Sequence, residues 1–391
     1  MNFFTEAKSL VKENIRDYGM YIALLFIMLT FSFMTDGLFM SSRNISNLLD
    51  STGYIAVLAV GMTLVIVIRH IDLSVGFAAG FMGAIAAILL TKAGVPVYFT
   101  IPIILALGIV IGLFNGLLIA WFGIPAFVAT LAGMLIFRGA LLQVTEQTGT
   151  IIIRDKAFNA IGNGYLPSIM EVNGLHLLSL ILGALFIVFY IYSELSTRKN
   201  KIKYQFEVVS KGIFTLKLVL VSFIIAYITW ILAGYNGFSW TVVIMLLVVA
   251  IYHFLTKKTV LGRHIYAVGS NPEAAHLSGI NVNKITYIVF GSMGMLAALS
   301  GILFTSRLQS ATTTAGTLFE LDAIAAAYVG GVSSAGGVGK VSGAIIGAIV
   351  MASLSSGMNL LGVGISYQYI IRGGVLAGAV IFDVMTRKKR G

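Results

Sequence analysis

Long apolar runs separated by short polar stretches make up most of the chain. A helix that crosses a membrane needs about 20 predominantly apolar residues. Twelve segments have this character, and they lie at residues 18–34, 54–69, 73–91, 98–122, 125–144, 175–193, 218–235, 240–255, 285–306, 319–333, 340–358 and 367–385. The pattern predicts an all-α polytopic membrane protein with about 10–12 transmembrane helices.

Two of these segments are short for a full crossing. Residues 54–68 would span only about 22 Å as a helix, and the apolar part of the tenth segment is shorter still. Each is followed by a polar turn that contains glycine, "RHIDLSVG" at 69–76 and "SSAGGVGK" at 333–340, and then by a limb rich in small residues. We predict two broken helix pairs, 54–91 and 319–358, which are either re-entrant hairpins or full spans. Interrupted helices in two halves of a transporter indicate a substrate path between them.

Composition supports the membrane class. The 391 residues are 58% hydrophobic and 10% charged, whereas soluble domains carry about 25% charged residues. Residues 1–17 form a charged leader with the pattern of an interfacial helix, and residues 18–391 form a single transmembrane domain. The chain has no cysteine, which excludes disulfides and thiolate chemistry.

The net charge of +11 is unevenly distributed. Lysine and arginine concentrate in the leader, in a basic loop at 195–217, at 256–264 and in the tail at 386–391. Basic loops stay on the cytoplasmic side of a membrane protein, so this distribution predicts that both termini are cytoplasmic. The charge therefore reports topology and contact with lipid rather than nucleic-acid binding.

The chain offers little for catalysis. Its five histidines are scattered and do not have the spacing of metal ligands. The segment "GGVGKVSG" at 336–343 resembles a phosphate-binding loop, but Val341 follows Lys340 where such a loop needs serine or threonine. We expect no catalytic site, metal or cofactor in this chain.

The basic segment 256–284 predicts a short helix at 272–278 on the membrane surface. Its signals are a capping Ser270 or Asn271, Pro272 at the first position, Glu273 in the first turn and Gly279 at the end. These features alone fit either a docking site or a capped surface helix without a partner.

The sequence "EAAHLSG" at 273–279 is similar to the cytoplasmic-loop signature of permease subunits in bacterial ATP-binding-cassette importers. The whole chain resembles the branch that imports monosaccharides, the ribose, galactose and xylose permeases. The resemblance rests on four phrases in order, at 61–76, 115–139, 262–282 and 320–347. An extra basic loop and span at 197–235 make the chain most similar to xylose or multiple-monosaccharide permeases.

The resemblance implies a non-catalytic subunit of the inner membrane that works as a homodimer and passes a monosaccharide into the cytoplasm. ATP and magnesium would be bound by a separate cytoplasmic ATPase with two fused cassettes. A periplasmic or lipid-anchored sugar-binding protein would deliver the sugar. The residues expected to couple the permease to the ATPase are Pro272, Glu273, Ala274, Ala275 and Gly279.

Candidate residues of the translocation path or gate lie in and near the two broken pairs. They are Asp72, Ser74, Gly76, Asn115, Glu320, Asp322, Gly336 and Gly337. The polar ones either satisfy backbone groups where the helices are interrupted or contact the sugar. Family members commonly have small or acidic residues where this chain has Arg69 and His70, so the role of these two is open. Arg69 and Lys340 are expected to extend toward the cytoplasmic face.

Two other functions fit an apolar chain of this kind. A proton-coupled secondary sugar transporter would need acidic or histidine side chains facing a central cavity, and it would not need a docking helix. A structural subunit without transport would lack the broken helix pairs.

Overall fold

The computed structural model describes residues 15–146, 149–168, 170–172 and 174–388. The predicted leader, residues 1–17, lies largely outside this part. The long helices are α2 (Ile15–Met34), α3 (Ser42–Val67), α4 (Val75–Thr91), α5 (Val97–Ala120), α6 (Ala126–Thr145), α8 (Leu177–Lys203), α9 (Lys211–Ala233), α10 (Trp240–Lys258), α13 (Val282–Leu308), α15 (Val341–Leu360) and α16 (Ile365–Lys388). The short helices are η1 (Leu38–Met40), α7 (Lys156–Asn163), α11 (Val260–Ser270), α12 (Pro272–Leu277) and α14 (Phe319–Val329).

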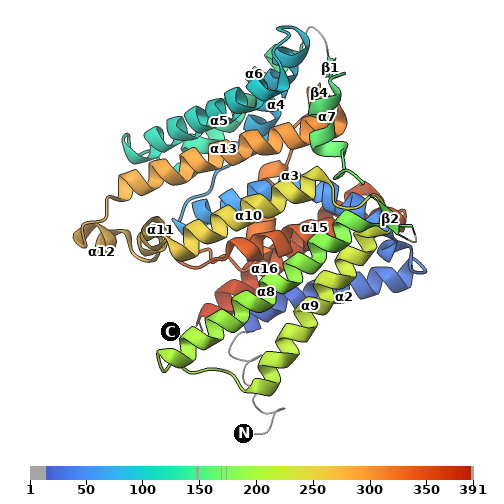
Figure 1. The fold of residues 1–391 in the computed structure, drawn as a ribbon. Coiled ribbons are helices and arrows are strands. Elements are labelled where there is room, and N and C mark those ends of the chain that lie inside the picture. The colour runs from blue at the N-terminus through green and yellow to red at the C-terminus, as the bar shows by residue number, and fades with distance from the viewer. Residues whose placement is uncertain (1–14, 147–148, 169, 173, 389–391) are drawn as a thin grey trace.

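The all-α membrane fold is confirmed. Each of the twelve predicted segments contains a helix, and within the described residues nine helices are long and apolar enough to cross a membrane. In Figure 1, α4, α5, α6 and α13 form one layer, α3, α10 and α15 lie next to it, and α2, α8 and α9 lie on the far side. The protein is thus a multi-pass membrane protein.

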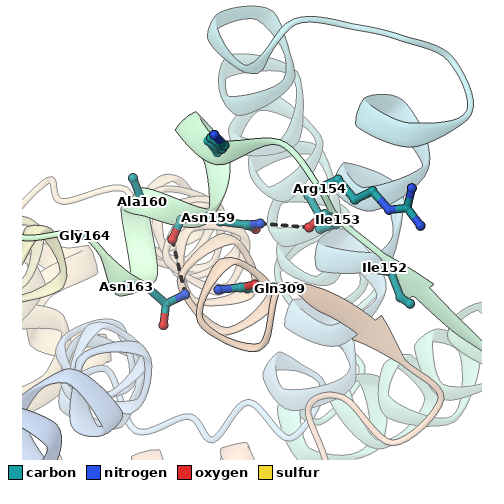
Figure 2. Close-up of a pocket in the computed structure, with 9 residues that line it drawn as sticks. Ile152, Ile153, Arg154, Asn159, Ala160, Asn163, Gly164 and Gln309 are labelled. Atoms are coloured by element: carbon teal, nitrogen blue, oxygen red, sulfur yellow. Dashed lines mark hydrogen bonds between the residues drawn. The ribbon is translucent and has the colours of Figure 1, made fainter.

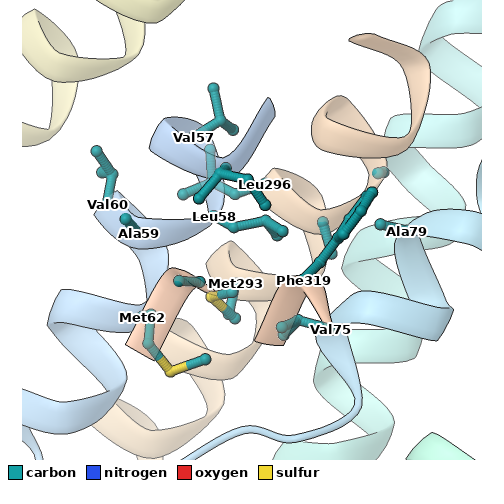
Figure 3. Close-up of a cluster of buried hydrophobic side chains, with 14 of the residues drawn as sticks. Val57, Leu58, Ala59, Val60, Met62, Val75, Ala79, Met293, Leu296 and Phe319 are labelled. Carbon is teal, nitrogen blue, oxygen red and sulfur yellow. The ribbon is translucent and has the colours of Figure 1, made fainter. Parts of the chain in front are cut away.

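The core lies around α3 and α13. α3 is buried without interruption from Ile55 to Val67. Figure 3 shows its Leu58 and Met62 beside Met293 of α13, with Phe319 of α14 in the same cluster. Glycines allow α13 to approach α5 closely, because a β-carbon on Gly294 would overlap the carbonyl oxygen of α5 residue 108. Such small-residue contacts are typical of helices packed within a membrane.

Short strands close one end of the helix bundle. β1 (Thr150–Ile152) pairs antiparallel with β4 (Ser310–Thr312), and β2 (Glu171–Val172) pairs with β3 (Leu175–His176). α7 lies beside the first pair in Figure 1, at the opposite end of the molecule from α11 and α12. The connection between α6 and α8 therefore contains strand β1 and helix α7 in its described part.

The start predicted for the short helix at 54–68 is wrong, because α3 begins at Ser42 and has 26 residues. Its first three turns carry polar side chains, which lowered the apolar signal. Two of the buried ones are satisfied within the protein: Thr52 Oγ1 donates to the carbonyl of Leu48, and the Asp50 carboxylate accepts from the hydroxyl of Ser239. A buried helix tolerates polar residues that a lipid-facing helix would not.

The two interrupted helix pairs also differ in geometry. We name residues 68–74, between α3 and α4, the first break, and residues 330–340, between α14 and α15, the second break. α4 packs on α13, α6 and α5 instead of folding back along α3, so the first pair is not a hairpin. α14 does fold back on α15, where a β-carbon on Gly330 would overlap the Gly343 carbonyl. The two helices therefore pack against each other as a hairpin only in the second pair.

The basic loop expected at 195–217 is mostly helical. α8 extends to Lys203 and α9 begins at Lys211, which leaves residues 204–210 as the connection. Charged residues prolong both helices beyond their apolar parts, and the exposed Lys217 forms an ion pair with Glu194 across the two helices at 2.7 Å. The basic residues therefore belong to helix ends.

Candidate coupling and gating site

The predicted short helix of the basic segment is present as α12. Asn271 caps it by accepting a hydrogen bond from the Ala274 backbone N–H at 3.1 Å, and Pro272 occupies the first position. Gly279 ends it with a left-handed backbone, φ +84°. The helix thus ends at Leu277, one residue before the predicted end.

One side of α12 is buried against the protein and the other side is exposed. Ala275 is buried, whereas the Leu277 side chain is 87% exposed. Glu273 lies in the first turn, where a carboxylate stabilises the helix dipole. A rigid, exposed helix at the end of the bundle suits docking of a partner, and that role for Pro272, Glu273, Ala274, Ala275 and Gly279 stays a prediction.

The sequence interpretation missed α11, the helix directly before α12. Thr259 caps it, accepting a hydrogen bond from the Gly262 N–H at 3.1 Å, and Ile265 and Val268 are buried. The signal was available, since a threonine cap followed by apolar residues three to four apart is typical of an amphipathic helix. The connection between α10 and α13 therefore contains two consecutive helices.

At the first break, three predicted side chains come together. Asp72 Oδ1 accepts hydrogen bonds from the backbone N–H of Ser74 at 2.9 Å and from its hydroxyl at 2.6 Å. Asn115 of α5 donates to the Ser74 hydroxyl oxygen at 2.9 Å. All three are at most 2% exposed. The network satisfies an interrupted backbone and ties it to α5, which supports the structural reading of these residues over sugar contact.

Gly76 and Glu320 also meet, at the second residue of α4. A β-carbon on Gly76 would overlap the Glu320 carboxylate, so the glycine makes room for that side chain. Glu320 is 5% exposed, and its Oε2 has no hydrogen-bond partner within the described residues. Its neighbour Asp322 points elsewhere and pairs with Arg372 of α16.

At the second break, Gly336 and Gly337 both have left-handed backbones, with φ of +79° and +71°. Asp383 of α16 accepts hydrogen bonds from the Ser334 backbone N–H and hydroxyl, each at 3.2 Å. The N–H of Gly337 donates to the carbonyl of Val67, the last residue of α3, at 2.8 Å. A β-carbon on Gly336 would also overlap the Arg69 side chain of the first break. The two breaks therefore touch, although some 260 residues separate them along the chain.

The other end of the molecule carries a shallow hollow of about 470 Å³ between α7, the segment after β1, and Gln309. Figure 2 shows Asn159 donating to the Ile153 carbonyl at 2.8 Å and Asn163 donating to the Asn159 carbonyl. None of the predicted site residues lines it. Among the described residues, no three histidine, aspartate or glutamate side chains gather as metal ligands would.

Comparison with known proteins shows which family the sequence resembles. The chain matches the protein family described as "Branched-chain amino acid transport system / permease component" over residues 44–195 and 160–380. It is 40% identical over 376 residues to the xylose transport system permease protein XylH of Haemophilus influenzae, covering 96% of this chain and 98% of that protein. No solved structure is significantly similar.

Two further relatives are also similar over most of their length. XylH of Escherichia coli strain K12 is 39% identical over 386 residues, which cover 99% of this chain and 95% of that protein. The ribose import permease protein RbsC of Haemophilus influenzae is 35% identical over 366 residues, covering 93% of this chain and 91% of that protein. Similarity to sugar permeases thus extends over nearly the whole chain.

Proposed function

The chain belongs to the permease component family of the branched-chain amino acid transport type, and from this premise we propose that it is the permease subunit of an ATP-driven, binding-protein-dependent importer of xylose or a related monosaccharide. The observation that carries the proposal is the 39–40% identity to two xylose permeases over nearly the full length. The ribose permeases are less similar, at 34–35% identity, which favours xylose.

The chain supplies the path, and a separate subunit supplies the energy. In this proposal a cytoplasmic ATPase with two fused cassettes binds ATP and magnesium and presses on α12. Sidedness follows from charge: in Figure 1 the α8–α9 connection, α11 and the C-terminal end of α16 lie at the same end of the bundle as α12. Basic clusters at one end favour the cytoplasm, so that end faces the ATPase.

The opposite end, with α7 and the β1–β4 pair, faces outward and receives the sugar-binding protein. A second copy of the permease completes the pore. The path itself passes the two breaks, with Asp72, Ser74, Gly76 and Asn115 at the first, and with the second-pair residues Glu320, Asp322, Gly336 and Gly337. We propose that these residues shape the gate and that the sugar is held by the binding protein.

Uptake of labelled xylose tests the function. The permease is reconstituted in proteoliposomes with its ATPase, and the sugar-binding protein is supplied on the outer side. We expect accumulation that needs all three proteins and stops when ATP is replaced by a non-hydrolysable analogue. Accumulation by the permease alone under a proton gradient would contradict the proposal and favour a secondary transporter.

Substitutions in α12 test the docking role. Replacing Glu273 or Gly279 by alanine should lower sugar-stimulated ATP hydrolysis about tenfold, the scale of one interface hot spot, while membrane insertion stays normal. Glu207→Ala, an exposed acid in the α8–α9 connection, is the matched control. Normal hydrolysis and uptake in both α12 variants would remove α12 as the docking site.

A further inference from the structure

Arg69 has an unusual backbone at the start of the first break. Its φ is +67°, in the left-handed region that residues other than glycine rarely adopt. A residue kept there needs its surroundings to hold it. The contacts of the Arg69 side chain show what holds it.

The guanidinium group binds the end of α11. Nε of Arg69 donates to the carbonyl of Gly269 at 2.7 Å, and Nη2 donates to the carbonyl of Ser270, the last residue of that helix. The last carbonyls of a helix lack partners within it, and a cation there also stabilises the helix dipole. The fork of arginine can hold two carbonyls at once, whereas a lysine ammonium acts as a point charge.

The second break is fastened to the same place. Gly337 donates its N–H to the Val67 carbonyl, two residues before Arg69. From α11, the Tyr266 hydroxyl donates to the Gly339 carbonyl at 2.6 Å. Burial raises the pKa of Tyr266 above its ordinary value, so this hydroxyl remains a donor at neutral pH.

The first break, the second break and the end of α11 pack closely against one another. A β-carbon on Gly336 would overlap the Arg69 side chain, and one on Gly269 would overlap the Val67 carbonyl oxygen. Packed elements of this kind shift between discrete arrangements instead of deforming gradually. A movement of the α11 end must therefore displace both breaks or detach from them.

α12 connects to this junction through one residue. Asn271 donates its N–H to the Ala267 carbonyl of α11 at 3.1 Å, and its side chain caps α12. The end of one helix is thus the beginning of the other. Force applied to α12 reaches the carbonyls that Arg69 holds without an intervening flexible loop.

We propose that Arg69 is a positioning residue that binds the end of α11 to both breaks, so that displacement of α12 moves the two breaks together. The inference rests on the proposed function, because it assumes that a partner ATPase displaces α12. It assigns Arg69 a role within the protein instead of contact with the sugar. A loss of this link separates ATP hydrolysis from sugar movement.

The test measures sugar imported per ATP hydrolysed in the complete reconstituted complex. Variants are Arg69→Gln, which loses the charge and the fork, and Arg69→Lys, which keeps the charge. Arg43→Gln is the matched control, an exposed arginine in the first turn at the opposite end of α3. The ratio should fall about tenfold in Arg69→Gln, as for loss of a charged hydrogen-bond pair. The ratio should fall less in Arg69→Lys and should stay unchanged in Arg43→Gln.

The outcomes separate the two proposals. A wild-type ratio in both Arg69 variants, with normal import by the wild type, overturns the role of Arg69 and leaves the importer proposal intact. Absence of ATP-dependent import by the wild type overturns both. Should Arg69→Gln fail to insert, Arg69→Lys and Tyr266→Phe decide alone: lowered ratios with unchanged melting temperature support the link, and unchanged ratios reject it.

Discussion

Both breaks interrupt a helix within the bundle, but different interactions stabilise them. The first is held by its own buried side chains, with Asp72 and Ser74 bound to each other and to Asn115. The second is rich in glycine and is held from outside, by Asp383 of α16 and Tyr266 of α11. We infer that the first break keeps its internal structure when it moves, and that the second break changes shape with its neighbours.

The difference has a clear physical origin. Opening a buried polar network leaves donors and acceptors without partners, and each such group is costly in a medium of low polarity. Glycine, by contrast, adopts left-handed and extended backbones at similar energy. A glycine-rich turn can therefore change shape when the helix that holds it moves.

The largest effect is expected at the first break. Asp72→Ala removes the acceptor of two hydrogen bonds, so the free energy of unfolding should fall by about 2–4 kcal/mol. Thermal and denaturant unfolding of the purified permease measure this loss. The double variant with Asn115→Ala should lose less than the sum of the single changes. A loss below about 0.5 kcal/mol for Asp72→Ala would mean that the first break is not fixed by this network.

A smaller effect is expected for Gly337→Ala at the second break. Its φ of +71° strains any other residue, and the new β-carbon would meet the Ser270 hydroxyl. We expect a loss of about 1–2 kcal/mol. Gly364→Ala is the control, because its β-carbon meets no atom within 4 Å. Equal stability of the two variants would show that the left-handed turn is not required.

The smallest effect is expected for Asp383→Asn. An amide oxygen can still accept from Ser334, although more weakly than a carboxylate, so stability should fall by only about 1 kcal/mol. Sugar import should also decrease, because the link between the second break and α16 is weakened. Import that remains at the wild-type rate would indicate that this contact is only structural.

The sequence predicted the helices well where lipid dictates composition. Apolar length alone located all twelve segments, and the capping pattern around Pro272 located α12 within one residue. The start of α3 was missed because its polar first turns face protein, with Asp50 bound to Ser239. The hydropathy pattern indicates which segments contact lipid, and it misses helical segments whose polar groups are satisfied inside the bundle.

The junction around Arg69 could not be predicted from local patterns. Its carbonyl partners lie 200 and 201 residues further along the chain, and only tertiary packing brings them to it. The same holds for the path of α4, which leaves α3 to pack on α13. Sequence located the two breaks, but which elements each break contacts depends on how the helices pack.

Hydrogen exchange of the backbone in the intact complex tests the contrast between the breaks most directly. Amides of residues 68–74 and 330–340 are followed by mass spectrometry with the ATPase nucleotide-free and ATP-bound, since exchange reports local opening. We predict slow exchange at 68–74 in both states and faster, ATP-dependent exchange at 330–340. Equally fast exchange at both breaks, or no response to ATP at 330–340, would contradict a first break that keeps its internal structure and a second break that changes shape with α11.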